Sequence, residues 1–251
     1  MHNTILEICT GDLDSVQAAA TGGATRIELC SALSEGGVTP SLGLLTEALR
    51  VSGLQVHVLI RPRGGDFLYT PAEVACMEAD VKAAARAGAH GVVIGALLPD
   101  GTIDTDTCRR LIASADGQNV TFHRAFDLCR NPEEALETII SLGCNRLLTS
   151  GCAPSAREGI PMLRKLICQA GDRLTIMPGG GIAPDNAALI MRETGCSELH
   201  ASARSSVASD MLYRNTDVAM GAPGSDEYSR KVTDPAIVRL ILEQMALQSN
   251  N

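Results

Sequence analysis

The feature that most constrains this chain is the regular alternation of two patterns. A short apolar run rich in β-branched residues is followed by an Ala- and Leu-rich stretch with helical periodicity, and this pair occurs eight times in 251 residues. Strands that alternate with helices predict a parallel sheet covered by helices, and eight such units in this length are typical of a TIM barrel. A doubly wound open sheet is the alternative, but the early Gly-x-Gly-x-x-Gly turn of that fold is missing. We therefore predict an α/β fold, a single TIM (β/α)8 barrel formed by one domain over residues 1–251.

The predicted boundaries follow the apolar runs and the residues that start and stop helices. Several helices begin at a proline or just after Asp, Ser or Asn, as the first helical turn favours. The segment 204–234, between the last strand and the last helix, is predicted to be a long loop; lids, subunit interfaces and mobile linkers all have this length. The predicted strands are Thr4–Cys9, Thr25–Cys30, Gln55–Ile60, Gly91–Gly95, Asn119–His123, Arg146–Thr149, Leu174–Met177 and Glu198–Ala201. The predicted helices are Asp14–Ala20, Leu42–Val51, Pro71–Ala87, Asp104–Ala115, Pro132–Leu142, Ala156–Ala170, Pro184–Glu193 and Pro235–Leu247.

Composition excludes several classes of partner. The net charge is −8 and basic residues form no run, which argues against nucleic-acid binding, because that needs clustered Lys and Arg. The first residues lack the pattern of a secretory signal, and the apolar runs are too short to span a bilayer. Nine cysteines, an odd number at irregular spacing, are typical of reduced thiols. We expect a soluble cytoplasmic protein with no membrane partner.

Ionisable residues gather where the predicted strands end, as in "VTFHRAFD" and "VHVLIRPRGGD". Residues two apart on a strand face the same side, so Glu7 shares a face with Cys9, and Glu28 with Cys30. Functional residues of TIM barrels lie at the carboxyl ends of the strands, which predicts a site here. The alternative is a polar network that satisfies itself and fills the barrel. If the protein is an enzyme, the candidates for proton transfer are Glu7, Glu28, His123 and Asp127.

A second group of residues predicts an anion site. Arginine side chains bind carboxylate or phosphate at two points, although Arg61 and Arg63 could instead pair with Asp66 or Asp127. The stretches "MPGGGI" and "HASARSS" follow the seventh and eighth strands, where TIM barrels often bind phosphate. The candidate anion-binding residues are Arg61, Arg63, Asp66, Arg124, Gly179, Gly180, Gly181, His200 and Ser202.

Cys9 and Cys30 close two neighbouring predicted strands and are candidate metal ligands. If they lie level, their backbones are about one strand spacing apart, ~5 Å. Two thiolates at that distance suit Cu(I), whereas the alternative is a pair of inert core thiols. The motifs Cys-x-x-Cys, His-Glu-x-x-His, Walker A and Gly-x-Ser-x-Gly are absent from the sequence.

The blocks "RIELCSALSEGGVTPSLG", "IRPRGGDFLY", "VTFHRAFD", "MPGGGI" and "HASAR" closely resemble the CutC family, often named copper homeostasis proteins. The matching blocks occur in the family's order from near residue 5 to near residue 235. The resemblance implies a TIM barrel, a homo-oligomer (dimer or tetramer), a role in copper homeostasis, and Cu(I) held by Cys9 and Cys30. The residues alone also support two alternatives: an enzyme acting on a phosphorylated or carboxylated small metabolite, and a purely structural protein.

Overall fold

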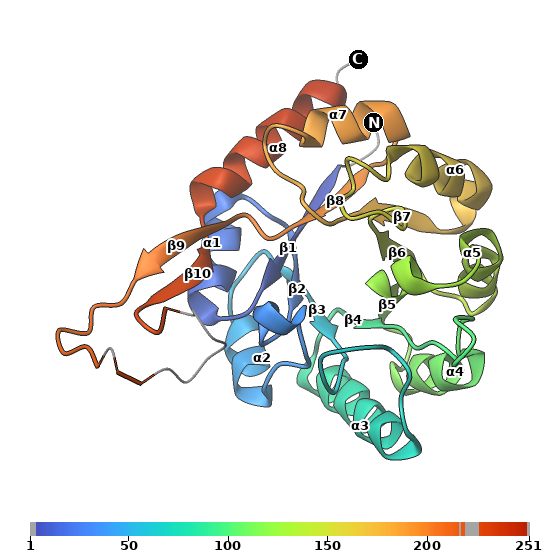
Figure 1. The fold of residues 1–251 in the computed structure, drawn as a ribbon, viewed down its shortest axis with the longest axis horizontal. Helices are drawn as coiled ribbons and strands as arrows, with labels where there is room; N and C mark the ends of the chain where they lie inside the picture. The colour runs from blue at the N-terminus through green and yellow to red at the C-terminus, as the bar shows by residue number, and fades with distance from the viewer. Residues whose placement is uncertain (1–3, 216, 219–225, 250–251) are drawn as a thin grey trace.

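Eight parallel strands form the centre of the molecule in a computed structural model that describes residues 4–215, 217–218 and 226–249 (Figure 1). Their order is β7-β6-β5-β4-β3-β2-β1-β8, and a parallel bridge from Gly179 to His200 joins the two outer strands. The predicted α/β fold, a TIM barrel, is therefore confirmed. The strands are β1 Ile5–Thr10, β2 Arg26–Leu29, β3 Gln55–Leu59, β4 Gly91–Ile94, β5 Asn119–Phe122, β6 Arg146–Thr149, β7 Thr175–Pro178 and β8 Glu198–Ala201.

Eight helices surround this barrel (Figure 1). The predicted sixth and seventh helices begin later than expected. Residue Ala156 lies before its helix because its amide donates to the carbonyl of Gly180, which holds the chain against the loop after β7. The helices are α1 Leu13–Gly22, α2 Leu42–Ala48, α3 Pro71–Ala87, α4 Thr105–Ser114, α5 Pro132–Ser141, α6 Ile160–Ala170, α7 Ala187–Thr194 and α8 Pro235–Ser249, and short 3-10 helices cover η1 Leu33–Glu35, η2 Arg124–Leu128 and η3 Gly171–Arg173.

Helix α3 shows how the sequence sets these boundaries. The Thr70 side chain accepts a hydrogen bond from the amide of Glu73, and the Glu73 carboxylate accepts one from the amide of Thr70. Pro71 fits the first turn because its missing N–H would have no partner there. At the other end Gly88 has a φ of 91°, a left-handed conformation that glycine adopts without strain, and the chain turns towards β4.

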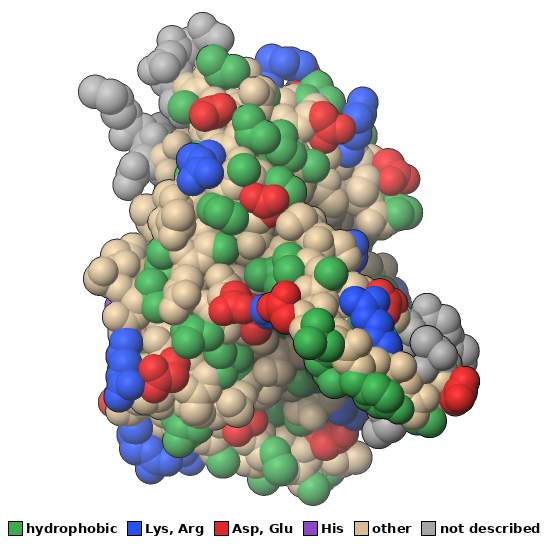
Figure 2. Space-filling model, turned by 90° about the vertical axis from the view of Figure 1, so that its left-hand side faces the viewer, with side chains coloured by type: hydrophobic (Ala, Val, Ile, Leu, Met, Phe, Trp, Pro, Cys, Tyr) green, Lys and Arg blue, Asp and Glu red, His purple; other side chains and the backbone are tan. Residues whose placement is uncertain are grey.

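The segment 204–234, predicted as a loop, contains an antiparallel pair of strands, β9 Arg204–Ala208 and β10 Ser229–Thr233. This hairpin projects from the barrel beside α1 (Figure 1), where the Thr233 amide donates to Ser15. Residues 216 and 219–225 of this segment lie outside the described residues. We call the projecting segment, residues 204–215 and 226–233, the hairpin arm. Figure 2 faces this side of the molecule and shows hydrophobic side chains at the surface of the arm. The exposed hydrophobic residues of the arm include Val207, Met211, Leu212 and Tyr213. No helix of the described chain is long and apolar enough to cross a membrane.

The two faces of the barrel strands carry different side chains, apolar ones towards the helices and charged ones towards the barrel interior. The outward side chains of β1 and β2, such as Ile8 and Ile27, join the hydrophobic core beneath the helices. The inward side chains are charged: Arg26 Nε lies 2.6 Å from Glu7, and the other end of its guanidinium contacts Glu198. Arg146 Nε lies 2.6 Å from Glu198 as well. The barrel interior is thus filled by paired charges, which burial tolerates because each has an opposite partner.

We predict that Arg26→Gln destabilises the protein by about 3–5 kcal/mol, because Glu7 and Glu198 would remain buried without the shared cation. Urea denaturation measures the free energy of unfolding. Arg109→Gln is the control, since Arg109 pairs with Asp106 at 3.3 Å with side-chain exposures of 65% and 92%. Breaking such an exposed pair costs less than about 1 kcal/mol. Equal losses in the two variants would contradict a central role for Arg26.

Candidate functional site

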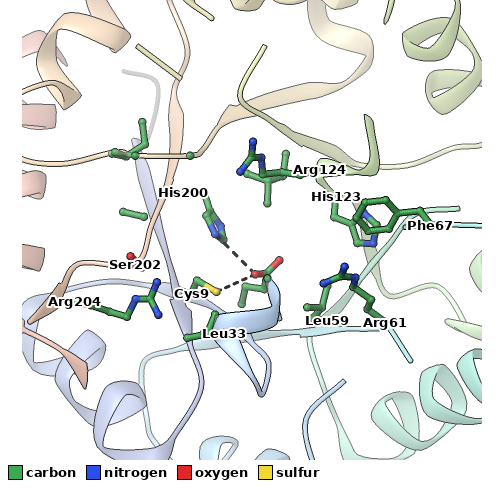
Figure 3. Close-up of a pocket in the computed structure, with 17 residues that line it drawn as sticks. Cys9, Leu33, Leu59, Arg61, Phe67, His123, Arg124, His200, Ser202 and Arg204 are labelled. Atoms are coloured by element: carbon green, nitrogen blue, oxygen red, sulfur yellow. Dashed lines mark hydrogen bonds and ion pairs between the residues drawn. The ribbon is translucent and has the colours of Figure 1, made fainter. Parts of the chain in front are cut away.

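A pocket of about 260 Å³, here called the mouth pocket, opens at the carboxyl ends of the barrel strands (Figure 3). Nine of the residues proposed from sequence line it: Cys9, Glu28, Arg61, His123, Arg124, Gly180, Gly181, His200 and Ser202. Six do not line it: Glu7, Cys30, Arg63, Asp66, Asp127 and Gly179. The remaining lining residues are Leu33, Gly36, Leu59, Phe67, Leu148, Ile182, Ala201 and Arg204.

Of the two cysteines expected to bind a metal, Cys9 lines the mouth pocket and Cys30 lies directly behind it. The strand register pairs Cys9 with Glu28, so Cys30 lies two residues further along β2 and the two backbones are not level. Barrel strands are staggered in this way because they tilt relative to the axis. The Cys9 and Cys30 side chains nevertheless point towards each other, and their two sulfur atoms lie 3.7 Å apart. Cys30 Sγ also donates to the carbonyl of Thr10.

Glu28 and His200 complete this group of donors. Cys9 Sγ donates to Glu28 Oε2 at 3.2 Å, and His200 Nε2 lies 3.9 Å from the same oxygen (Figure 3). One donor atom each from Cys9, Glu28 and His200 lies within 4.8 Å of the others, an arrangement able to hold a metal ion. Each of Cys9, Glu28 and His200 affects the pKa of the other two. The hydrogen bond to Cys30, burial and the charge of Glu28 raise the pKa of Cys9 well above its ordinary value.

His200 joins the mouth pocket to the charges inside the barrel. Its Nδ1 lies 2.8 Å from Glu7 Oε1. Burial alone would lower the pKa of His200, but the Glu28 charge and hydrogen bonds to Cys9 and Glu7 raise it instead. Burial opposes ionisation of Glu7 too, yet Arg26 and His200 together hold its pKa well below the usual range. Burial raises the pKa of Glu28, and His200 only partly opposes this. Glu7 is thus an ionised partner for His200 and is itself outside the pocket.

Arg61, expected to bind an anion, holds the loops after β2 and β3 together. Its guanidinium donates to the carbonyls of Glu35, Gly37 and Gly65 at 2.7–2.9 Å and lies 4.9 Å from the centre of the Phe67 ring. These contacts use both terminal nitrogens of Arg61, and they satisfy three backbone carbonyls of the two loops. Arg61 therefore shapes the wall of the pocket.

His123 is buried beside this wall, with its ring 4.9 Å from Phe67. Its Nδ1 accepts from the Ala125 amide at 3.2 Å, which leaves the proton of the neutral ring on Nε2. No group in the described chain pairs with that Nε2. Burial, and next the charge of Arg61, lower the pKa of His123 to about 3. His123 is a neutral donor.

Arg63 and Asp66 lie outside the pocket, contrary to the expectation that they bind the anion. Arg63 Nε lies 2.6 Å from Glu73, and its Nη2 lies 3.0 Å from Asp66. Its guanidinium also stacks over Tyr69 at 5.4 Å. The alternative weighed from sequence, a structural ion pair with Asp66, is what the structure has.

Asp127, proposed to transfer protons, is likewise fully engaged. Its carboxylate accepts from the amides of Ser150 and Cys152 at 3.1 Å and from both hydroxyls of Thr149 and Ser150. Arg124 Nε lies 2.7 Å from it. Asp127 therefore fixes the end of β6 and positions Arg124, which does line the pocket.

Of the three glycines after β7, Gly179 belongs to the barrel sheet, and Gly180 and Gly181 line the pocket. The amide of Gly179 donates to the carbonyl of Thr149, so this glycine belongs to the barrel. A Cβ there would lie 2.5 Å from a Leu148 methyl, which explains why the position needs glycine. Gly180 and Gly181, with φ of 100° and 77°, turn the chain along the pocket wall.

Four charged residues escaped the sequence analysis: Arg26, Arg146, Glu198 and Arg204. The strand alternation already used could have found three of them. Arg26 is two residues before Glu28, and Glu198 is two before His200. Arg146 likewise shares its parity with the pocket residue Leu148. Arg204 could not be found in this way, because it follows the barrel and begins β9.

Comparison with known proteins agrees with this geometry. The family model described as "CutC family" matches residues 4–205. This chain belongs to the CutC family. A family protein CutC from Chromobacterium violaceum is 52% identical over 241 residues, which cover 96% of this chain and 98% of the relative. The human protein named copper homeostasis protein cutC homolog is 50% identical over 238 residues, covering 94% and 87%.

The solved structures include a CutC protein from Streptococcus agalactiae with a TM-score of 0.76. It is 32% identical, and the match covers 79% of this chain and 98% of that one. The resemblance to CutC stated from the sequence blocks is thus confirmed.

We predict that His123 makes this CutC chain less stable in mild acid. The unfolded chain binds a proton on this side chain near pH 6.5, whereas the folded protein resists it until about pH 3. Between these values the unfolded state holds more protons, so stability falls as pH falls, by about 2 kcal/mol from this residue at pH 5.

Urea denaturation at pH 7 and pH 5 measures this effect. His123→Gln should lose less stability than wild type between the two pH values, by about 2 kcal/mol. His90→Gln is the control, because that histidine is exposed at the surface, and it should follow wild type. A His123→Gln variant with the wild-type pH dependence would show that the buried ring is not the cause.

Proposed function

We propose that this protein binds Cu(I) through Cys9 and Cys30 and thereby serves copper homeostasis in the cytoplasm. The observation that carries the proposal is the 3.7 Å separation of the two sulfur atoms. Two metal–thiolate bonds of about 2.3 Å at a near-tetrahedral angle put their sulfur atoms about 3.8 Å apart. One ion can therefore bridge the two thiols with little movement of either side chain.

The chemistry of the donors supports a soft ion. Thiolates are the preferred ligands of Cu(I), whereas carboxylates suit hard cations such as Mg²⁺. His200 Nε2 is the third candidate ligand, since its other nitrogen is held by Glu7. Glu28 has a different role: it accepts the hydrogen bond of the Cys9 thiol, and that thiol must lose its proton before its sulfur can ligate a metal.

The setting of the protein supports the same function. All nine cysteines are free thiols in the structure, as in proteins of reducing compartments. The relatives from human and mouse, each 50% identical, are named copper homeostasis protein cutC homolog. We also propose that the chain forms a homo-oligomer, which the exposed Met211, Leu212 and Tyr213 of the hairpin arm support.

The decisive experiment is competition for Cu(I) against a coloured Cu(I) chelator under reducing conditions. Wild type should withdraw one Cu(I) per chain. The double variant Cys9→Ser/Cys30→Ser should bind more than about 100-fold more weakly, because even the loss of residues that only support a metal ligand costs 10–100-fold.

A matched control separates this pair from ordinary cysteines. Cys76→Ser/Cys168→Ser also removes two thiols, but both are exposed and neither lines the mouth pocket. It should keep wild-type affinity. Unchanged affinity in the Cys9/Cys30 variant, or an equal loss in the control, would remove the proposal.

A further inference from the structure

The loops after β5, β7 and β8 bring two arginines and several backbone amides to the mouth pocket. Arg204 extends from the start of β9 towards the middle of the pocket (Figure 3). Its guanidinium makes no ion pair with any described residue, although the whole chain carries a charge of −8. A cation left unpaired at a pocket wall, in an acidic protein, is placed to meet an anion.

Arg124 adds a second cation to this wall. Its Nε binds Asp127 and its Nη2 donates to Ser150, and these two contacts fix the guanidinium in place. Its remaining nitrogen, Nη1, has no partner in the described chain and lies beside Gly180. A Cβ on Gly180 would come within 3.4 Å of that Nη1, so the glycine lets the loop lie against the guanidinium.

Backbone amides supply the remaining donors. Gly181 and Ser202 line the pocket, and within the described residues no hydrogen bond from either amide is found. The amide of Gly180 faces the carbonyl of His200 in the bridge that joins β7 to β8. The amides of Gly181 and Ser202 belong to the loops after β7 and β8, the position at which TIM barrels frequently bind phosphate.

We propose that the mouth pocket binds the phosphate monoester of a small organic molecule, with the phosphate held by Arg124, Arg204 and the amides of Gly181 and Ser202. Donors from two arginines and two loops suit the three free oxygens of a phosphate better than the two oxygens of a carboxylate. The proposal goes beyond Cu(I) binding and uses none of the sulfur atoms.

The rest of the pocket limits the size of the ligand. Its volume of about 260 Å³ is below the range of drug-sized sites. Leu33, Leu59 and Phe67 line it with apolar surface, and Glu28 offers a polar contact at the inner end. The organic part is therefore short, a chain of a few carbons with a polar group at its far end.

Calorimetry with the full-length, metal-free protein tests the proposal with three matched probes. Glycerol 3-phosphate should bind, glycerate should bind more weakly, and glycerol should not bind. Inorganic phosphate should compete with the phosphate ester. The absence of binding by glycerol 3-phosphate at millimolar concentration, or tighter binding of glycerate, would overturn the proposal.

Substitution of Arg204 tests where the phosphate group binds. Arg204→Gln removes an exposed cation and should weaken glycerol 3-phosphate binding at least about tenfold, since charge-assisted hydrogen bonds to phosphate would be lost. Arg109→Gln, on the outer surface of α4, is the control and should leave it unchanged. Equal affinity in Arg204→Gln and wild type would refute the assigned position.

The same variants separate this site from the copper site. Cys9→Ser/Cys30→Ser should still bind glycerol 3-phosphate, and Arg204→Gln should still withdraw Cu(I) from the chelator. Loss of phosphate-ester binding in a folded Cys9/Cys30 variant would contradict the assignment to the arginine wall. The two experiments are therefore independent: loss of Cu(I) binding does not test phosphate-ester binding, and the reverse also holds.

Discussion

The ion pair network around Arg26 is the interaction on which the site depends. Arg26 is 1% exposed and lies between Glu7 and Glu198, so it is the cation that these two buried carboxylates share. Glu7 in turn binds His200, and His200 faces Glu28 and Cys9. A charge buried near the middle of the barrel thus sets the protonation and orientation of the donors at the pocket, because in a medium of low polarity each charge must be matched by its neighbour.

The mouth pocket joins two kinds of chemistry that come from different parts of the chain. Strand β1 places the Cys9 sulfur at its inner end, next to the Cys30 sulfur that follows β2, whereas the loops after β5, β7 and β8 line it with arginine and backbone amides. The arginine side is fixed by Asp127, which holds Arg124 through the end of β6.

The sequence predicted which strand ends and loops form the pocket, but it did not predict the partners of individual charged side chains. Alternation along β1, β2 and β8 brings Glu28, Cys9 and His200 together, since the period of two is a property of the strand itself. The roles of Arg63 and Asp127 depended on partners far along the chain or in loops, namely Glu73 and Ser150, and no local pattern shows such contacts. The relative height of Cys9 and Cys30 also depends on the stagger of the barrel, which belongs to the closed sheet.

This division explains why the alternatives weighed from the sequence are not exclusive. A self-satisfied polar network does exist, but it occupies the middle of the barrel, where the two cations Arg26 and Arg146 pair with the two carboxylates Glu7 and Glu198. One layer further out the pairing is incomplete. Arg204 and one nitrogen of Arg124 keep unused donors there, and Cys9 lines the same pocket with the Cys30 sulfur 3.7 Å behind it. Because the inner layer already neutralises its own charge, the outer layer is free to use its donors on a ligand.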